Sequence, residues 1–191
     1  MFTQCDIDNF YPSIKEELHN KAIEWAEQFV HISEEEKEII SHARKTLLFD
    51  KSKPWVKKDG KDFDVTIGGY DGAEECELVG LYILSQLKHL KMRFALYRDD
   101  GAAISSQTPR QNDIMRKEIQ KIFERNGLKI TIQTNMKVMD FLDVTLDLNS
   151  RTYRPFNKPN NTPLYINVLS NHPPGVKKNI SLGIQTRISK N

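Results

Sequence analysis

Cysteines and long apolar runs are scarce in this chain of 191 residues. The two cysteines, Cys5 and Cys76, are too few for a disulfide framework, and with the five histidines they form no zinc-ligand spacing. The longest apolar stretches, such as residues 78–84, are far shorter than the about 20 residues that span a membrane. Asp6 and Asp8 near the start exclude a secretory signal. The sequence predicts an intracellular protein of the nucleus or cytoplasm, with no membrane contact.

Acidic residues are absent from residues 151–191, which carry seven Lys and Arg, whereas residues 1–50 carry eleven Asp and Glu against five Lys and Arg. This asymmetry suits a protein that holds cations in one place and a polyanion in another, although a solvated basic tail accounts for it equally well. Nine Phe, six Tyr and two Trp predict a globular core. We therefore expect one domain over residues 1–150 and a basic, proline-rich segment over 151–191.

The spacing of apolar residues, the turn residues and the capping patterns predict an order of helices and strands. Capping boxes are predicted at Ser13 with Glu16 and at Ser33 with Glu36. The predicted helices cover 14–30, the stretch from Ser33 to near Phe49, 73–90, and the stretch from Thr108-Pro109 to Gly127. The predicted strands are 2–7, a hairpin over 54–67 that turns at Asp59-Gly60, a hairpin over 94–104 that turns at 98–101, and segments at 128–134, 139–148 and 151–156. The tail after Pro155 is expected to be irregular, with a short terminal helix.

This βαββαβ order predicts a ferredoxin-like α+β fold, an antiparallel sheet with helices packed on one face and an open opposite face. In such a sheet the first strand neighbours the hairpin at 97–101, so Asp6 is expected to lie close to Asp99 and Asp100. Three carboxylates in one patch repel one another unless a cation offsets them. Mg²⁺ suits such oxygen ligands, and two such ions about 3.5–4 Å apart assist phosphoryl transfer.

Five segments resemble, in order and rough spacing, the palm motifs of reverse transcriptases. They are Asp6–Tyr11, Gly68–Ala73, Tyr97–Asp100, Gly127–Lys129 and Phe141–Val144. Within that family the chain is similar to retroelement enzymes of the Penelope-like or related non-LTR kind, including Ser170–Pro173, where their thumb begins. The resemblance implies that 1–150 is a palm and 151–191 is the start of the thumb.

The resemblance also implies an RNA-directed DNA polymerase, a nucleotidyltransferase that binds a template-primer and deoxynucleotides. It uses two Mg²⁺ ions, with Mn²⁺ as a substitute. By position, Asp6, Asp99 and Asp100 are the implied catalytic residues and metal ligands, whereas Asp8 is solvated or faces substrate. The implied substrate contacts are Tyr11 beneath the nucleotide sugar, Gly68, Gly69 and Gly72 against template and nucleotide, and Lys129 or Lys137 as proton donor to pyrophosphate.

Other interpretations stay open. Asp99 and Asp100 suit an ordinary hairpin turn, Tyr11 suits a cover over the core, and the glycines suit a loop that enters a helix. The chain as a whole also suits a Mg²⁺ nuclease, or a non-catalytic nucleic-acid-binding remnant of a retroelement polymerase. In the remnant, phosphates would be held by the basic tail through Arg151, Arg154, Lys158, Lys177, Lys178 and Arg187.

Two features depart from the reverse transcriptase pattern. The glycine segment has Gly69-Tyr70-Asp71-Gly72 where relatives commonly carry Ser/Pro or Pro/Gln. The fingers and most of the thumb have no counterpart, because Met1 stands five residues before Asp6. We therefore expect a fragment or degenerate copy of a retroelement polymerase, or one part of a longer product, with the subfamily, the template preference and the oligomeric state left open.

Overall fold

The computed structural model describes residues 1–45, 48–55, 61–156, 158, 166–167 and 169–190. The chain divides into two compact units, Met1–Phe156 and Asn157–Asn191. The second unit contains α6 (Pro174–Lys190), a helix of 17 residues that is longer than the short terminal helix predicted. Across the described ranges, no helix is both long enough and apolar enough to cross a membrane.

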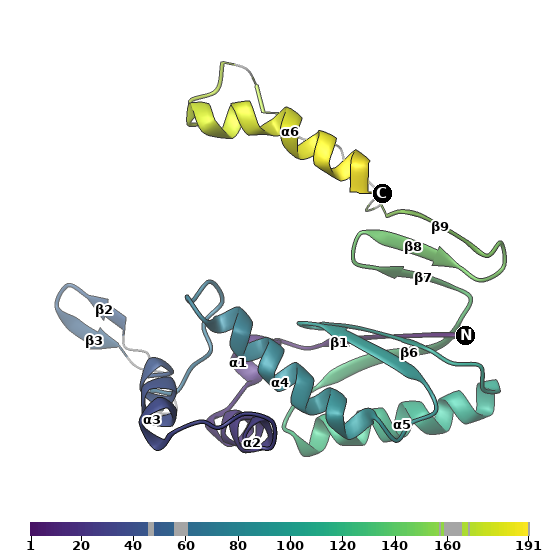
Figure 1. Ribbon diagram of the computed structural model, residues 1–191, viewed down its shortest axis with the longest axis horizontal. Coiled ribbons are helices and arrows are strands. Elements are labelled where there is room, and N and C mark those ends of the chain that lie inside the picture. Colours follow the sequence, from purple (N-terminus) through teal and green to yellow (C-terminus); the bar gives the residue numbers. More distant parts are fainter. Residues whose placement is uncertain (46–47, 56–60, 157, 159–165, 168, 191) are drawn as a thin grey trace. The chain divides into compact units, whose positions relative to one another are not determined.

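The first unit is built on a four-stranded sheet in which all neighbouring strands are antiparallel. Its strands, in spatial order, are β4 (Arg93–Tyr97), β5 (Asp100–Ile104), β1 (Phe2–Ile7) and β6 (Ile130–Met136). The helices α4 (Gly72–Leu87) and α5 (Pro109–Arg125) pack on this sheet (Figure 1). The predicted ferredoxin-like α+β arrangement is confirmed, because this strand order is the one that a βαββαβ chain gives.

Alternation along β1 assigns the two faces of the sheet. Cys5 and Ile7 are buried on the helix side, and Ile7 belongs to a core that includes Ile83 and Phe123. On the opposite face, Phe2 belongs to a smaller buried cluster that covers only one end of the strand. At the other end of β1, Asp6 is exposed on this open face.

A separate three-stranded sheet packs against the smaller cluster that contains Phe2. Its strands are β7 (Val138–Phe141), β8 (Val144–Asp147) and β9 (Thr152–Pro155). The β-rich segment predicted over 139–148 is confirmed as the two paired strands β7 and β8, because the chain turns at Leu142, which has a φ of 53°. Gln4 on β1 donates a hydrogen bond of 2.7 Å to the carbonyl oxygen of Asp140 on β7.

The helix predicted over 14–30 is confirmed as α2 (Glu16–Ala26) with shorter bounds, and a separate short helix, α1 (Phe10–Ser13), precedes it where the sequence predicted a turn at Pro12. The predicted capping box of Ser13 and Glu16 is wrong. Ile14 is extended, so Ser13 ends α1 rather than beginning α2, and its hydroxyl donates to the carbonyl oxygen of Asp8.

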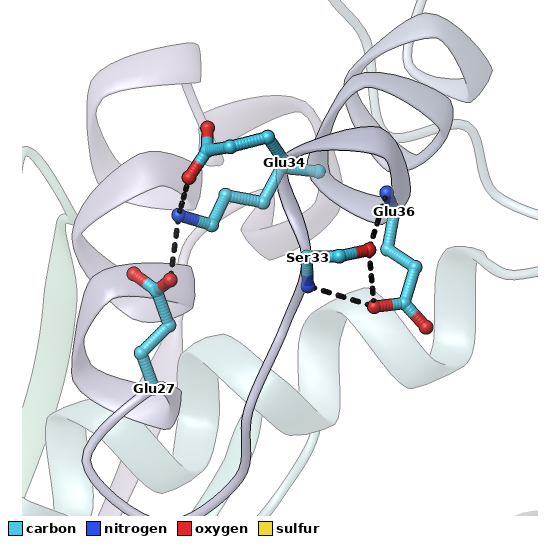
Figure 2. Close-up of polar contacts among 5 residues, drawn as sticks. Glu27, Ser33, Glu34 and Glu36 are labelled. Atoms are coloured by element: carbon cyan, nitrogen blue, oxygen red, sulfur yellow. Dashed lines mark hydrogen bonds and ion pairs between the residues drawn. The ribbon is translucent and has the colours of Figure 1, made fainter.

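The second capping box is confirmed and begins α3 (Glu34–Ala43). Ser33 and Glu36 satisfy each other's backbone N–H groups, as Figure 2 shows. Lys37 joins this helix to the end of the preceding one, because its Nζ lies 2.5 Å from Glu27 and 2.8 Å from Glu34 (Figure 2).

The segment after α3 differs from the prediction. The helix ends at Ala43 rather than near Phe49, and residues 48–55 form a hairpin of β2 (Leu48–Asp50) and β3 (Lys53–Trp55). The hairpin predicted over 54–67 is wrong where it is described, because Trp55 pairs with Leu48 and Phe63 forms a bridge with Lys45. Its predicted turn lies in 56–60, outside the described residues.

Candidate active site

The two aspartate motifs meet at one end of the main sheet. Asp6 on β1 is directly opposite Asp100 on β5, and the backbone N–H of Ile7 donates a 2.9 Å hydrogen bond to the carbonyl oxygen of Asp99. Residues opposite each other in an antiparallel pair have Cβ atoms about 4.5–5.5 Å apart, and like charges there are destabilising. Residues 6 and 99–100, far apart in the chain, are therefore side by side in the fold.

The hairpin that carries Asp99 is tighter than the sequence predicted. Its turn contains only Arg98 and Asp99, because Tyr97 already pairs with Asp100. Arg98 has a φ of 54°, a left-handed conformation that a residue with a Cβ adopts at an energetic cost. The Arg98 guanidinium carbon lies 5.4 Å from the centre of the Tyr97 ring. The tight turn places Asp99 beside the end of β1.

Burial and mutual repulsion act on these carboxyl groups. Burial is the main cause that raises the pKa of Asp6 above its ordinary value, and the charges of Asp99 and Asp8 raise it further. Burial likewise raises the pKa of Asp100, followed by the charges of Asp99 and Asp6. Behind them, burial and the charges of Asp6 and Asp100 raise the pKa of the Cys5 thiol to about 12. Loss of solvation and like charge therefore both oppose the ionisation of Asp6 and Asp100.

Cys5 also fixes how closely β1 and β5 approach. A Cβ atom at Gly101 would lie 2.6 Å from the Cys5 sulfur and 3.3 Å from the ring of Phe94. Real Cβ contacts are not as short as the first of these, so this position requires glycine. The close approach keeps Asp100 opposite Asp6.

The donor set fits a magnesium ion in its chemistry. In the part of the chain that the structure describes, no group of three or more His, Cys, Asp or Glu is arranged to hold a metal ion. Mg²⁺ needs fewer protein ligands than this, since it is usually bound through one or two carboxylates and completes its shell with water and substrate phosphates. Asp6 and Asp100, paired in register, supply two carboxylates on the open face.

The raised pKa values predict a pH dependence in metal-free buffer. The folded state holds protons on Asp6 and Asp100 above their ordinary pKa of 3.8, so their contribution to stability is fully present below that pH. It is lost as the pH rises through the raised values. Relative to the parent, Asp100→Asn should therefore gain free energy of unfolding between pH 3.8 and neutrality. Urea titrations in chelator over that range measure it, and a difference independent of pH would contradict it.

Tyr11 lies between the glycine segment and the aspartate turn. Its Cε1 is 3.6 Å from the position that a Cβ would occupy at Gly72. Burial and the Cys76 thiol raise the pKa of its phenol, and Arg98 and Asp99 also act on it electrostatically. Its ring thus reaches the neighbourhood of the carboxylates, as a residue beneath a bound sugar must.

The three glycines of the segment are not equivalent. A Cβ at Gly72 would lie 2.7 Å from the carbonyl oxygen of Thr66, so glycine is required for α4 to begin against this backbone. Gly68 has a φ of 83°, which favours glycine, and a Cβ at Gly69 would lie 3.1 Å from the same Thr66 oxygen. These contacts account for the glycines as parts of a loop that leads into α4, without any contact with a template.

The structure separates the two candidate lysines. The carbonyl oxygen of Lys129 accepts a 3.0 Å hydrogen bond from the N–H of Asp8, which places Lys129 at the carboxylate end of β1. Lys137 follows Met136, which pairs with Phe2 at the opposite end of that strand. Of the two lysines, only Lys129 lies beside the aspartates.

The basic residues of the tail are divided between the two units. Arg151 and Arg154 are exposed on the first unit, at the beginning of β9 and within it. The other four belong to the second unit, where Lys158 and Lys178 are exposed, Lys177 is half-buried and Arg187 lies in α6.

Two polar pairs, one buried on both sides and one with only its arginine buried, were missed by the sequence analysis. His19 on α2 meets Glu75 on α4, with 2.8 Å between Nδ1 and Oε1, and both residues are less than 7% exposed. Arg44, only 3% exposed, forms an ion pair with Asp71 in the glycine segment. His19 lies next to Leu18 among the apolar positions of its helix, and this position could have indicated from the sequence that His19 is buried. Nothing in the sequence pattern indicated the Arg44 pair.

Two telomerases are among the solved structures that resemble this chain. Apo telomerase from Candida tropicalis, truncated from its C-terminal domain, has a TM-score of 0.61 and 12% identity, over 81% of this chain and 35% of that one. Telomerase from Candida albicans, in complex with the TWJ fragment of telomeric RNA, has a TM-score of 0.52 and 11% identity, over 84% of this chain and 31% of that one. No family model and no curated protein matches.

These similarities concern the fold. At this identity they show that the chain shares its fold with part of telomerase. The chain spans about a third of the length of each telomerase chain.

Proposed function

We propose that this chain is the palm of an RNA-directed DNA polymerase of the retroelement kind. The reaction is attack of a primer 3′-hydroxyl on the α-phosphate of a deoxynucleotide, with a template-primer as the nucleic-acid partner. The observation that carries the proposal is the pairing of Asp6 with Asp100, beside Asp99, on the open face of a polymerase-like sheet. The carboxylates of this patch raise one another's pKa values, which lowers the stability of the folded chain when they are ionised. A bound cation would offset this repulsion, which supports a functional role for the patch.

Asp6, Asp99 and Asp100 would hold two Mg²⁺ ions, which when bound supply positive charge to the attacking and leaving oxygens of phosphoryl transfer. The chain's own residues position the reactants. Tyr11, close to both Gly72 and the Asp99 turn, would lie beneath the sugar and exclude a 2′-hydroxyl. Lys129, at the same end of β1, is the better placed of the two lysines to donate a proton to pyrophosphate.

The test is the linkage between metal and stability. A ligand that binds only the folded state at a hundredfold excess over its Kd raises the free energy of unfolding by about 2.7 kcal/mol. Urea titrations of the parent in chelator, Mg²⁺ and Mn²⁺ should show such a gain. Asp6→Asn and Asp100→Asn should lose most of it, whereas Asp50→Asn, an exposed aspartate of the separate β2–β3 sheet, should respond like the parent.

The outcomes separate the polymerase from the non-catalytic binding remnant. An equal metal response in the parent and in both site variants would overturn the metal site. If the protein then still binds a primer-template duplex with a salt dependence that falls on removing the basic residues of the tail, the non-catalytic binding remnant is favoured. Metal-linked stabilisation together with nucleotide incorporation by a chain joined to fingers would establish the polymerase.

A further inference from the structure

Strand β4 ends the main sheet, so one side of its backbone has no neighbouring strand among the described residues. Strand β1 bonds the carbonyl oxygen of Asp99, and Asp100, the next residue, therefore directs its backbone groups toward β4. Tyr97 pairs with Asp100 across the two-residue turn and directs its own groups back toward β5. The alternate residues of β4 face the other way. The backbone N–H and C=O groups of Phe94 and Leu96 are thus directed outward from the edge.

This edge lacks most of the features that keep edge strands from pairing with another strand. Natural edges are commonly blocked by proline, by a bulge, by charged side chains or by a covering element. Within Arg93–Tyr97, all of which the structure describes, there is no proline, and the register with β5 runs without a bulge. Arg93 is the one charged residue, and it lies at the end of the strand. The outward backbone groups therefore suit a partner that supplies a strand.

The sequence of β4 is complementary to itself when two copies run antiparallel. Its exposed residues Arg93, Ala95 and Tyr97 alternate with the half-buried Phe94 and Leu96. A pair centred on Ala95 would place Phe94 opposite the partner's Leu96, so that the outward backbone groups of both strands bond each other. The same register would place Arg93 opposite the partner's Tyr97, where a guanidinium and an aromatic ring attract each other.

The helix side of this edge is apolar as well. Leu81 on α4 is 54% exposed, and a cavity of about 200 Å³ between α4 and β4 has a lining that includes Leu81, Leu84 and Leu96. Antiparallel pairing about a twofold axis perpendicular to the sheet keeps the helices of both copies on the same side of the joined sheet. Leu81 would then have apolar surface of the second copy available for packing.

We infer that β4 pairs antiparallel with β4 of a second copy of this chain, centred on Ala95, and joins the two four-stranded sheets into one. A strand of another protein could bond the same backbone groups, but the match of Arg93 with Tyr97 across the axis favours a second copy. The two turns that carry Asp99 would lie at opposite ends of the joined strands, so pairing does not bring their charges together. The inference uses only the sheet edge and does not depend on the proposed function.

Charge at the central position tests the register. Ala95 is exposed, so Ala95→Lys and Ala95→Glu leave the core unchanged. Sedimentation equilibrium of the full chain should show a dimer for the parent. Each variant alone should dissociate at least about tenfold more readily, because like charges would face each other across the axis. An equimolar mixture of the two variants should recover the dimer, because opposite charges then face each other.

A cysteine at the same position tests the geometry. Residues directly opposite each other in a non-hydrogen-bonded antiparallel pair have Cα atoms about 4.5 Å apart, within the range of about 4.4–6.8 Å that a disulfide spans. Ala95→Cys should therefore give a disulfide-linked dimer on mild oxidation. Ile104→Cys, exposed on the neighbouring strand β5, should not, and the native Cys5 and Cys76 are buried.

The side-chain match is tested separately. Arg93→Ala removes two cation–π pairs from the dimer and should raise its dissociation constant about five- to thirtyfold. Arg110→Ala, at an exposed arginine of α5, should leave it unchanged. A parent that stays monomeric across the micromolar range, a dimer indifferent to charge at position 95, or equal cross-linking at positions 95 and 104 would overturn the inference. So would a mixture of the two charge variants that fails to associate, which would leave a strand of another protein as the occupant.

Discussion

Replacing Glu75 with alanine is expected to lower the free energy of unfolding by about 1–3 kcal/mol, since it leaves the buried imidazole of His19 without its hydrogen-bond partner. The Glu75 carboxylate lies 2.8 Å from Nδ1 of His19, and their side chains are 6% and 3% exposed. His19 would then remain in the core beside Phe63, 5.4 Å from its ring centre, without its hydrogen-bond partner. Urea denaturation of the parent and the variant measures the loss.

A pair on the surface of α2 provides the matched control. Lys21 and Glu17 are 2.6 Å apart on this helix, but their side chains are 41% and 81% exposed. Glu17→Ala should therefore cost no more than about 0.5 kcal/mol. Replacing both His19 and Glu75 with leucine should cost less than Glu75→Ala alone, because no buried polar group remains unpaired. If Glu75→Ala and Glu17→Ala lower the free energy of unfolding equally, the buried pair contributes no more to stability than the surface pair.

The buried pair has a positional role for the site. It joins α2 to α4 one residue before Cys76, whose thiol interacts with the Tyr11 hydroxyl. Burial raises the pKa of the Cys76 thiol to about 12, so the thiol is neutral beside the phenol. Fixing α4 against α2 thus helps to fix the ring that we propose to lie beneath the nucleotide sugar.

The main sheet and its aspartates could be predicted because local signals and topology agree there. Alternation marks β1, a tight turn joins β4 to β5, and a capping box with proline begins α5 at Thr108. Once these elements are placed, the βαββαβ order leaves few ways to arrange the strands. The closeness of Asp6 to Asp100 follows from that order rather than from any short motif.

The errors lie where a local signal competed with another contact. Ser13 matched a capping box, but Pro12 lies within α1 and the Ser13 hydroxyl binds the carbonyl oxygen of Asp8. Leu48 and Phe49 continued a helical pattern, yet they pair with β3. Lys137 lay in a plausible segment, and only the register of β6 shows it to be at the far end of β1. The spacing of residues along the chain does not indicate which distant segments pair with each other.

The ion pair of Arg44 and Asp71 gives the second large expected effect, and it is asymmetric. The Arg44 side chain is 4% exposed, whereas that of Asp71 is 46% exposed. Asp71→Ala would leave a buried guanidinium without this partner and should cost about 3 kcal/mol, the lower end of the range for buried pairs. Asp71 makes no side-chain cap to α4, so no capping bond is lost with it.

The reverse substitution should behave differently. Arg44→Met replaces the buried charge with an apolar chain of similar length, and the half-exposed Asp71 then turns to water, so the expected cost is below about 1 kcal/mol. Arg44→Met should also restore most of the stability lost in Asp71→Ala. Urea titrations of the two single variants and the double variant form a complete cycle. Equal costs for the two single changes would show that other groups hold the guanidinium. The expected asymmetry would instead show that the cost of Asp71→Ala comes from the unpaired buried guanidinium and not from the loss of a link between α3 and the start of α4.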